Sequence, residues 1–375
     1  MVEREFKSVN KMRVLFWVPY PTEGASNRYR VEQYLPYLEK EGIRYSLHPF
    51  WSSSAYKILY KNGYYIKKSY FFICGTISRI IDLLRIARYE IVFIHREAYP
   101  IFGAIFETAL SILNKPIIFD FDDAIFLPAS SRPNNFIEGL KKPAKVINTL
   151  VKSKHVIAGN SYLSNFALRY NRSVTIIPTS IDTDKYYSKN RKASDEIVIG
   201  WMGSITTIDF LNLISGAFIQ LSKEFHNIIF KIVGGDFSIE GLSNIISKPW
   251  LLEDEIEDLK SFDIGIMPMP DNEWTRGKCG FKAIHYMNMG IPCVCSPVGA
   301  NKEIVTDGIN GFLAKSEEEW IEKLSLLIEN SELRKKLGMQ GRKTVEEKYS
   351  VKVNAPKYLE VLKKVYEERY EKSAD

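Results

Sequence analysis

Short apolar runs alternate along the chain with longer segments that have the periodicity of a helix. The first run is RVLFWVP (13–19), and a helical segment, VEQYLPYLEKEG (31–42), follows it and ends at a glycine. Further apolar runs lie at 91–95, 116–121, 155–160 and 174–178. Strands that alternate with helices in this way are typical of a parallel sheet with helices on both faces.

A second series with the same pattern starts after the polar stretch 180–195, SIDTDKYYSKNRKASD, which we interpret as a linker. The sequence therefore predicts an α/β protein with two domains, residues 1–182 and 183–350, followed by a closing helical segment, 351–375. Ligands of such folds bind in the cleft at the carboxyl ends of the strands. The apolar runs of the second series lie at 197–203, 228–236, 263–270, 292–297 and 311–315, and a helix is predicted over 208–225.

The composition narrows the choice of partners only slightly. The chain has 375 residues, and its net charge of +6 suits an anionic partner without distinguishing phosphate, acidic lipid and nucleic acid. No run of about 20 apolar residues predicts a membrane-spanning helix. The first residues lack the pattern of a secretory signal and the four cysteines form no CxxC pair, so we expect reduced thiols and a cytoplasmic location.

The segment RGKCGFKAIHYMNMGIPCVCS (276–296) gathers positive charge at a predicted helix start. With the start near Gly280, Lys278, Lys282 and His285 are spaced i, i+4, i+7 and share one face. A cation at a helix N-terminus is unfavourable by roughly 0.3–1 kcal/mol, and a bound diphosphate would reverse that sign. The alternative is a solvated lysine pair on a surface helix.

The longer stretch KCGFKAIHYMNMGIPCVCSPVGANKEIVTDGINGFL (278–313) resembles the donor-binding element of family-4 glycosyltransferases, the glycosyl transferases group 1, which have the GT-B fold. The resemblance covers most of residues 155–350, including the WMGS turn (201–204), and is weaker before residue 155. The residues that match the family's pattern are Met287, Gly290, Pro292, Ser296, Gly299, Glu303, Gly308, Gly311 and Phe312.

The resemblance implies that a sugar is transferred from a nucleoside-diphosphate sugar to an acceptor, usually with retention, without metal or cofactor. It favours a UDP-sugar, with a GDP-sugar as the alternative, and a glycan or lipid-linked acceptor in surface polysaccharide or glycoconjugate synthesis. It also implies two Rossmann-like domains facing across a cleft. Residues 1–182 would bind the acceptor, 183–350 the donor, and the helix in 351–375 would return to the first domain.

For the donor, we predict that Lys282 and Lys278 bind the diphosphate, with Arg276 as a third cation. Fixed cations and helix-end amides stabilise a leaving diphosphate, so Lys282 is also a predicted catalytic residue. The full predicted donor set is Gly203, Ser204, Arg276, Lys278, Gly280, Phe281, Lys282 and His285.

The chain departs from the family pattern at the donor site. Gly277 and His285 stand where the family has its two glutamates, and no basic pair follows the WMGS turn. We hypothesise that Lys278 and Lys282 replace that basic pair. Two acidic residues of the preceding loop are candidates to replace a lost glutamate: Asp271 and Glu273.

In the first half, EGASNRYR (23–30) occupies the place of the family's glycine loop, which faces donor phosphates and acceptor. We therefore predict contacts from this loop; an ordinary solvated loop is the alternative. The predicted loop residues are Gly24, Ser26, Asn27 and Arg28.

Charged residues also follow two predicted strands, with His95 after one and Asp122 and Asp123 after the other. We assign these three residues catalytic roles. Asp122 lies near the position where the family often has a histidine, and it would orient a sugar or acceptor hydroxyl. A DxD metal site of a GT-A enzyme is the alternative for this acidic cluster.

Residues 56–90 interleave aromatic side chains with basic ones, which suits an anionic membrane surface and a peripheral location on the inner face of the cell membrane. The alternative is an ordinary amphipathic helix pair whose apolar side lies in the core. A nucleic-acid binder would not need the glycine turns of the second half, and no GxGxxG follows the first strand as an NAD enzyme requires. A sugar-nucleotide-binding protein without transferase activity remains a rival.

Overall fold

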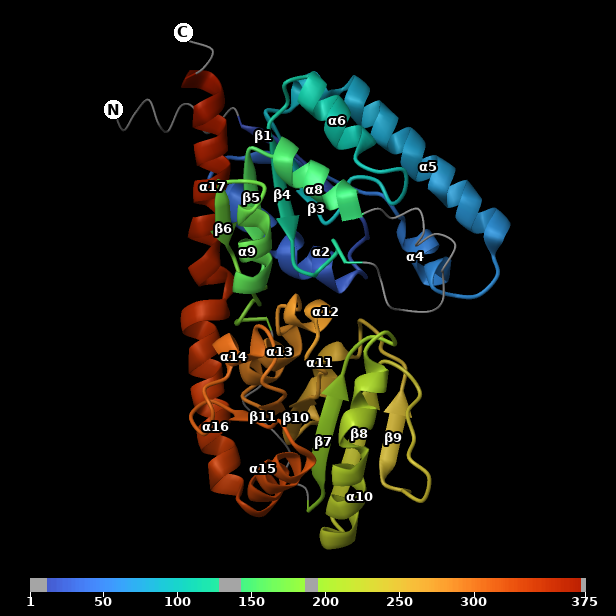
Figure 1. Ribbon diagram of the computed structural model, residues 1–375, viewed down its shortest axis with the longest axis vertical. Coiled ribbons are helices and arrows are strands. Elements are labelled where there is room, and N and C mark those ends of the chain that lie inside the picture. The colour runs from blue at the N-terminus through green and yellow to red at the C-terminus, as the bar shows by residue number, and fades with distance from the viewer. Residues whose placement is uncertain (1–11, 128–142, 186–194, 372–375) are drawn as a thin grey trace. The chain divides into compact units, whose positions relative to one another are not determined.

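The computed structural model describes residues 12–127, 143–185 and 195–371 (Figure 1). The chain divides into two compact units. Unit 1 comprises Met1–Thr179 and Asn354–Asp375, and unit 2 comprises Ser180–Val353. No helix in the described ranges combines the length and apolar character needed to span a membrane.

Unit 1 is built on a parallel six-stranded sheet with the order β2-β1-β3-β4-β5-β6. The strands are β1 (Arg13–Val18), β2 (Arg44–Pro49), β3 (Ile91–His95), β4 (Ile117–Phe121), β5 (His155–Ala158) and β6 (Val174–Ile176). Its helices are α2 (Ala25–Arg30), α3 (Leu35–Lys40), α4 (Ser53–Leu59), α5 (Tyr65–Leu84), α6 (Ile105–Ile112), α8 (Pro143–Lys152) and α9 (Ser161–Leu168), with 3-10 turns at Glu32–Tyr34 and Ile86–Arg88. The five predicted strands of this half are confirmed, and β2 was not predicted.

Unit 2 repeats this architecture with the strand order β12-β11-β10-β7-β8-β9, again parallel throughout the described pairs. The strands are β7 (Ile197–Met202), β8 (Ile228–Val233), β9 (Ile245–Lys248), β10 (Ile264–Met267), β11 (Cys293–Cys295) and β12 (Phe312–Leu313). The helices are α10 (Ser215–Glu224), α11 (Glu255–Lys260), α12 (Glu273–Arg276), α13 (Phe281–Asn288), α14 (Asn301–Ile304), α15 (Glu317–Glu329) and α16 (Ser331–Thr344), with a 3-10 segment at Ile208–Ile214 and a π turn at Val345–Tyr349.

Two predicted helices differ in detail from the observed ones. The helix expected over 31–42 is divided into a 3-10 turn and α3, and an additional helix, α2, precedes it. The helix expected over 208–225 begins as a 3-10 segment and becomes α-helical only at Ser215. The two α/β units themselves are as predicted.

The end of β7 is fixed by close packing against α13 in unit 2. The Tyr286 hydroxyl accepts a hydrogen bond from the Met202 amide (3.0 Å) and lies 3.3 Å from the Ile266 carbonyl oxygen. The Tyr286 ring lies against Gly265, where a Cβ atom would come within 2.4 Å of it. Glycine at this position of β10 therefore lets α13 approach the sheet closely.

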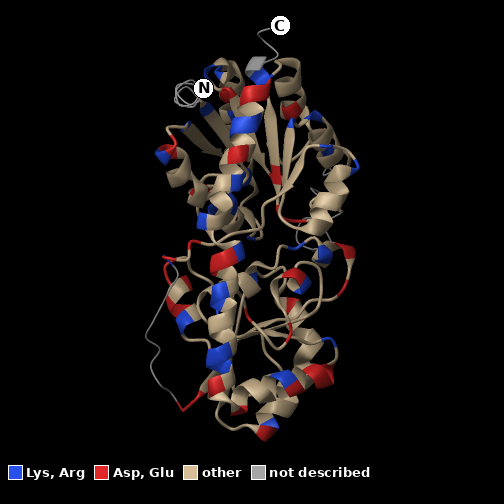
Figure 2. Cartoon of the chain, turned by 90° about the vertical axis from the view of Figure 1, so that its left-hand side faces the viewer, with Lys and Arg blue, Asp and Glu red and all other residues tan. Residues whose placement is uncertain are grey.

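Helix α17 (Val351–Glu371) begins in unit 2 and belongs to unit 1 from Asn354 onward. Figure 2 shows basic and acidic residues alternating along it. Its buried Tyr358 stacks on Tyr34, with ring centroids 4.4 Å apart, and on Phe93, at 5.3 Å. Lys363 forms an ion pair with Glu41 (2.8 Å). The last helix thus supplies part of the core of unit 1.

Helix α5 departs from the usual arrangement of a surface helix, which turns its apolar side inward, because its fully buried residues include two charged ones. Gly75, Arg79 and Asp82 are buried on its inner side. Arg79 donates to the carbonyl oxygens of Val18 and Ala98, at 3.1 and 3.0 Å. Burial lowers the pKa of Arg79 to about 10. The alternative that residues 56–90 direct their apolar side into the core therefore holds only in part for α5. Phe72 packs on the buried rings of Phe50 and Tyr99, but most of the other apolar residues of the helix are exposed.

We predict that Tyr358→Ala lowers the free energy of unfolding by about 3–5 kcal/mol, because it removes a buried ring that stacks on two others. Tyr358→Phe is the matched control. It keeps the ring and removes only a hydroxyl that has no hydrogen-bond partner among the described residues, so stability should be equal or slightly higher. Urea unfolding of both variants measures the difference, and equal loss in the two would contradict the stacking argument.

Candidate functional site

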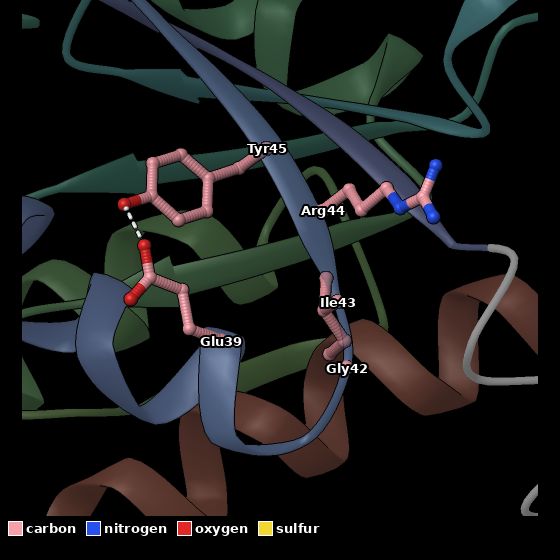
Figure 3. A pocket seen from close by; sticks show the side chains of 5 residues that line it. All are labelled: Glu39, Gly42, Ile43, Arg44 and Tyr45. Atoms are coloured by element: carbon pink, nitrogen blue, oxygen red, sulfur yellow. Dashed lines mark hydrogen bonds between the residues drawn. The ribbon is translucent and has the colours of Figure 1, made fainter.

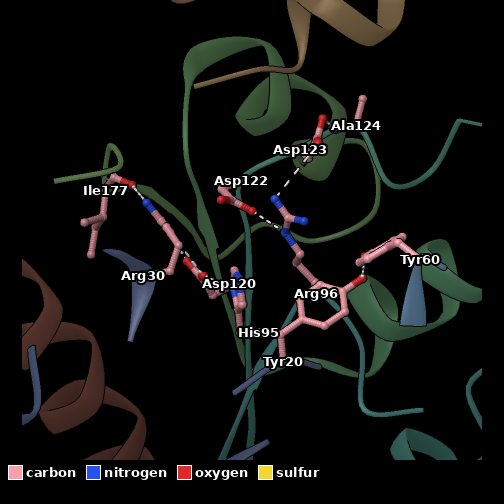
Figure 4. Close-up of polar contacts among 10 residues, drawn as sticks. All are labelled: Tyr20, Arg30, Tyr60, His95, Arg96, Asp120, Asp122, Asp123, Ala124 and Ile177. Carbon is pink, nitrogen blue, oxygen red and sulfur yellow. Dashed lines mark hydrogen bonds and ion pairs between the residues drawn. The ribbon is translucent and has the colours of Figure 1, made fainter. Parts of the chain in front are cut away.

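The carboxyl ends of β3 and β4 bring a buried polar cluster together in unit 1 (Figure 4). His95 and Asp120 are register partners, and His95 Nδ1 lies 2.7 Å from Asp120 Oδ2. Arg30, from α2, donates to both oxygens of the same carboxylate and to the Ile177 carbonyl oxygen. The side chains of Arg30, His95 and Asp120 have at most 1% exposure.

This cluster fixes the orientation of His95. A carboxylate only accepts hydrogen bonds, so His95 Nδ1 is the donor in its contact with Asp120. Nε2 is buried and has no hydrogen-bond partner in the described ranges. His95 was predicted to be catalytic; in the structure it has no exposed surface, and its hydrogen bond is to Asp120.

A second cluster, which is more accessible to solvent, lies just after His95 and Asp120 along the chain. Arg96 Nε donates to Asp122 Oδ1 (2.6 Å), and its guanidinium is 4.0 Å from Asp123. Arg96 adopts a left-handed backbone conformation (φ 58°), and its amide donates to the Asp120 carbonyl oxygen (2.7 Å). A non-glycine residue in this conformation is strained, and such strain is common at functional sites. The two predicted acidic residues are therefore brought together around one arginine.

Arg96 also sets the protonation of Asp122. Burial would raise the pKa of this carboxyl, but the positive charge of Arg96, with smaller contributions from His95 and Arg30, outweighs it and lowers the pKa well below 3.8. Asp122 is thus a permanently ionised hydrogen-bond acceptor at neutral pH. In the described part of the chain, no group of three or more His, Cys, Asp or Glu residues has a metal-binding arrangement.

The predicted loop 23–30 is largely a short helix. Gly24 is the residue before α2, and its amide donates to the Pro21 carbonyl oxygen (2.8 Å). Asn27 is 1% exposed and donates to Glu32 (2.7 Å), and Arg28 is 8% exposed. The alternative of an ordinary solvated loop is therefore wrong for Asn27 and Arg28, because their side chains pack within unit 1. Among the four predicted residues, only Ser26 is half-exposed.

In unit 2, the structure brings Lys282 against the glycine turn at the carboxyl end of β7. A Cβ atom on Gly203 would come within 2.5 Å of Lys282 Cε. Lys282 Nζ lies 3.5 Å from Thr207 Oγ1 and 5.3 Å from the centre of the Trp201 ring. Ser204, the next residue of the turn, is exposed. Gly203, Ser204 and Lys282 therefore form one local site.

Helix α13 begins at Phe281, after Gly280 in the left-handed conformation (φ 64°), as predicted. Lys278, however, is not part of this helix, because it belongs to the turn that follows α12, where its amide donates to the Thr275 carbonyl oxygen (3.1 Å). The predicted i, i+4, i+7 face is therefore wrong. Lys278 Nζ lies 3.9 Å above the Trp274 ring.

The remaining predicted donor residues differ in accessibility. Arg276 forms a 2.6 Å ion pair with Asp271. Asp271 is one of the two residues that we considered as replacements for a family glutamate, and in this pair it balances the charge of Arg276. Glu273 is exposed at the start of α12. His285 is 4% exposed, with its ring 5.1 Å from that of Phe281. Lys282 and Lys278 are the half-buried cations nearest to aromatic rings in this segment.

Sequence reasoning missed the aromatic and hydroxyl residues that position these lysines: Trp201, Thr207, Phe210 and Trp274. The Trp274 ring meets Phe210 edge to face, with centroids 5.9 Å apart. A tryptophan four residues before Lys278 was a signal that could have been used.

A separate shallow pocket lies at the amino end of β2 (Figure 3). Glu39, Gly42, Ile43, Arg44 and Tyr45 line it, and the Tyr45 hydroxyl donates to Glu39 (2.7 Å). Because ligands of parallel α/β sheets bind at the carboxyl ends of strands, we do not assign this pocket to the site.

We predict that Asp120→Asn lowers the free energy of unfolding by about 3–5 kcal/mol, because it leaves the buried Arg30 charge without its counter-charge. Asp195→Asn, at an exposed position, is the control and should change stability by less than about 0.5 kcal/mol. Urea unfolding of both variants tests this. A loss in Asp120→Asn as small as in the control would show that the buried pair does not hold unit 1 together.

Comparison with known proteins finds similarity to glycosyltransferases in both sequence and fold. Residues 196–330 match the family model described as Glycosyl transferases group 1. Two curated relatives are uncharacterized glycosyltransferases of Methanocaldococcus jannaschii. One is 32% identical over 149 residues, covering 37% of this chain and 40% of the relative. The other is 26% identical over 248 residues, covering 60% and 61%. The chain thus spans less than two thirds of each relative's length.

Among solved structures, HepE of Anabaena in complex with UDP and glucose has a TM-score of 0.66 with this chain. The superposition covers 94% of this chain and 99% of HepE, at 13% identity. A GT-A metal site is therefore the wrong interpretation of the acidic cluster, because the fold is GT-B. The chain has the GT-B fold, and residues 196–330 of its second unit are similar to the Glycosyl transferases group 1 family.

Proposed function

We propose that the protein is a glycosyltransferase that uses a nucleoside-diphosphate sugar as donor. The observation that carries this proposal is the position of Lys282 against the Gly203 turn, within the part of the chain that matches the group 1 family. A UDP-sugar is the favoured donor, supported by the HepE complex with UDP and glucose, and a GDP-sugar is the alternative. A thermal-shift screen with UDP-, GDP- and ADP-sugars tests the choice.

The diphosphate would bind where α13 begins. Lys282 is the second residue of this eight-residue helix, and the free amides of the first turn carry a partial positive charge of roughly half a unit. As the glycosidic bond breaks, negative charge grows on the diphosphate, and fixed cations stabilise it. Lys278, held over Trp274, is the second cation of the proposal. These lysines would supply charge stabilisation without a metal, and we propose retention at the anomeric carbon.

Unit 1 would bind the acceptor, a glycan or a lipid-linked saccharide in surface polysaccharide or glycoconjugate synthesis. Asp122 and Asp123 are partly accessible and would accept hydrogen bonds from sugar or acceptor hydroxyls. The low pKa of Asp122 makes it a fixed negative charge rather than a base that titrates near pH 7. A lipid-linked acceptor would place the protein in the cytoplasm, at the inner face of the cell membrane.

A second candidate is a protein that binds a sugar nucleotide without transferring the sugar. The replacement of both family glutamates, by Gly277 and His285, favours it. Product formation with a bound donor and candidate acceptors separates the two functions, because the second binds the donor but forms no glycosylated product.

We predict that Lys282→Ala weakens binding of the nucleoside diphosphate by about ten- to a hundredfold, the loss of one or two charged hydrogen bonds. Lys223→Ala, at an exposed position of α10, is the matched control and should leave affinity unchanged. Calorimetry with UDP and GDP measures both. Equal affinity in wild type and Lys282→Ala would remove the diphosphate assignment.

We predict that Asp122→Asn lowers turnover at least about tenfold with donor affinity unchanged, because the variant loses a charged hydrogen-bond acceptor. Since the folded-state pKa is depressed, the charge of Asp122 is present at every pH above 3.8 and disappears only as the pH falls below it. The ratio of wild-type to variant turnover should therefore be flat from about pH 5 to pH 9. Full activity of the variant would exclude the assigned role.

A further inference from the structure

The outer side of α5 carries a continuous apolar stripe. The positions follow a 4-3-4-3-4 spacing over the whole helix, which places all of them on one face. The stripe consists of Ile66 (88% exposed), Tyr70 (63%), Ile73 (56%), Ile77 (51%), Ile80 (48%) and Leu84 (81%). Isolated exposed apolar residues are ordinary, but a contiguous stripe of this kind marks an interaction surface.

The opposite side of α5 explains why this stripe cannot turn inward. Gly75, Arg79 and Asp82 are spaced i, i+4, i+7 and lie about 180° from the stripe at 3.6 residues per turn. A Cβ atom on Gly75 would come within 2.7 Å of the Phe50 carbonyl oxygen. Asp82 accepts hydrogen bonds from Trp17 Nε1 (2.8 Å) and lies 2.8 Å from His48 Nδ1. The inner side is thus fixed by specific polar contacts and close packing.

The charge around the stripe has one sign. Between residues 51 and 89 the sole acidic residue is Asp82, which is buried against Trp17 and His48. Basic residues stand before and within the first turn of α5 and after its last turn. They are Lys57, Lys61, Lys67, Lys68, Arg85 and Arg88, of which Lys68 is half-buried and the others are exposed.

We propose that α5 lies flat on an anionic lipid bilayer, with its apolar stripe inserted at the level of the headgroups. A helix of 20 residues is about 30 Å long, so the stripe offers an extended line of contact parallel to the surface. An interfacial helix inserts its apolar face about 5–10 Å, and basic side chains beside it bind acidic headgroups. Tyr70 suits this depth because its ring is apolar and its hydroxyl is polar.

A second copy of the chain is the rival occupant, since the spacing of the stripe would also suit two paired helices. Pairing two α5 helices brings basic ends together in either direction: lysines meet lysines in a parallel pair and meet Arg85 and Arg88 in an antiparallel one. Like charges at such positions are unfavourable, whereas an anionic surface is complementary to them. The charge pattern therefore selects the membrane.

This inference is independent of the proposed transfer reaction. It uses residues outside the two clusters assigned to donor and acceptor, and vesicle binding is measured without sugar nucleotide. The membrane proposal and the enzyme proposal can thus fail separately.

The test uses the full chain and vesicles of phosphatidylcholine alone or with about a third phosphatidylglycerol, compared at low and high salt. We expect binding to the anionic vesicles that weakens with salt. The double variant Ile73→Asp/Ile77→Asp should lower the partition coefficient at least about tenfold. The matched control Ile112→Asp/Leu168→Asp changes two residues, exposed by 76% and 50%, on other helices of unit 1, and should bind like wild type.

An unchanged circular dichroism spectrum and an unchanged urea-unfolding transition show that the variants fold. The proposal is overturned if wild type does not bind anionic vesicles, or if the stripe variant binds as well as the control. Analytical ultracentrifugation tests the rival occupant, a second copy of the chain. The stripe would be assigned to a second copy if the wild type forms a dimer that Ile73→Asp/Ile77→Asp abolishes, and if all variants bind vesicles equally.

Discussion

A single buried carboxylate, Asp120, organises the first unit. Its two oxygens accept hydrogen bonds from Arg30 on α2 and from His95 on β3, and Arg30 continues to the carbonyl oxygen of Ile177 beyond β6. A buried carboxylate is tolerated only when its oxygens accept hydrogen bonds, so the contacts of Asp120 with Arg30 and His95 must form together. The same carboxylate anchors the carboxyl ends of the central strands, where Arg96 and Asp122 then emerge at the accessible end of the sheet.

In the second unit, the corresponding constraint is steric. Gly203 lies against Lys282, and a Cβ atom on Gly234 would come within 1.8 Å of the Gly203 carbonyl oxygen. Tyr286 holds the end of β7 by its hydroxyl and contacts β10 by its ring. Small residues thus allow the turn, the neighbouring strand end and α13 to lie close together, and this close packing brings Lys282 against the turn.

The sequence predicted the features that depend on local residue patterns and missed those that depend on contacts between distant residues. Buried central strands are continuous apolar runs and were predicted, whereas β2 and β9 are half-exposed edge strands with mixed composition and were missed. Gly280 marked the start of α13 correctly. Lys278 was misplaced because helical spacing does not extend across that glycine, and the Trp274 contact depends on the short helix α12. The orientation of α5 depends on Arg79, whose partners are far away in sequence.

The division of unit 1 between the two ends of the chain has a consequence for biosynthesis. The sheet of this unit is translated before unit 2, but Tyr358, which stacks on Tyr34 and Phe93, is translated after all of unit 2. Domains generally fold as units and in order of synthesis. Here that order is partly inverted, because synthesis of the second unit is completed before synthesis of the first. In the nascent chain, Tyr34 and Phe93 therefore lack this stacking partner until α17 has been synthesised.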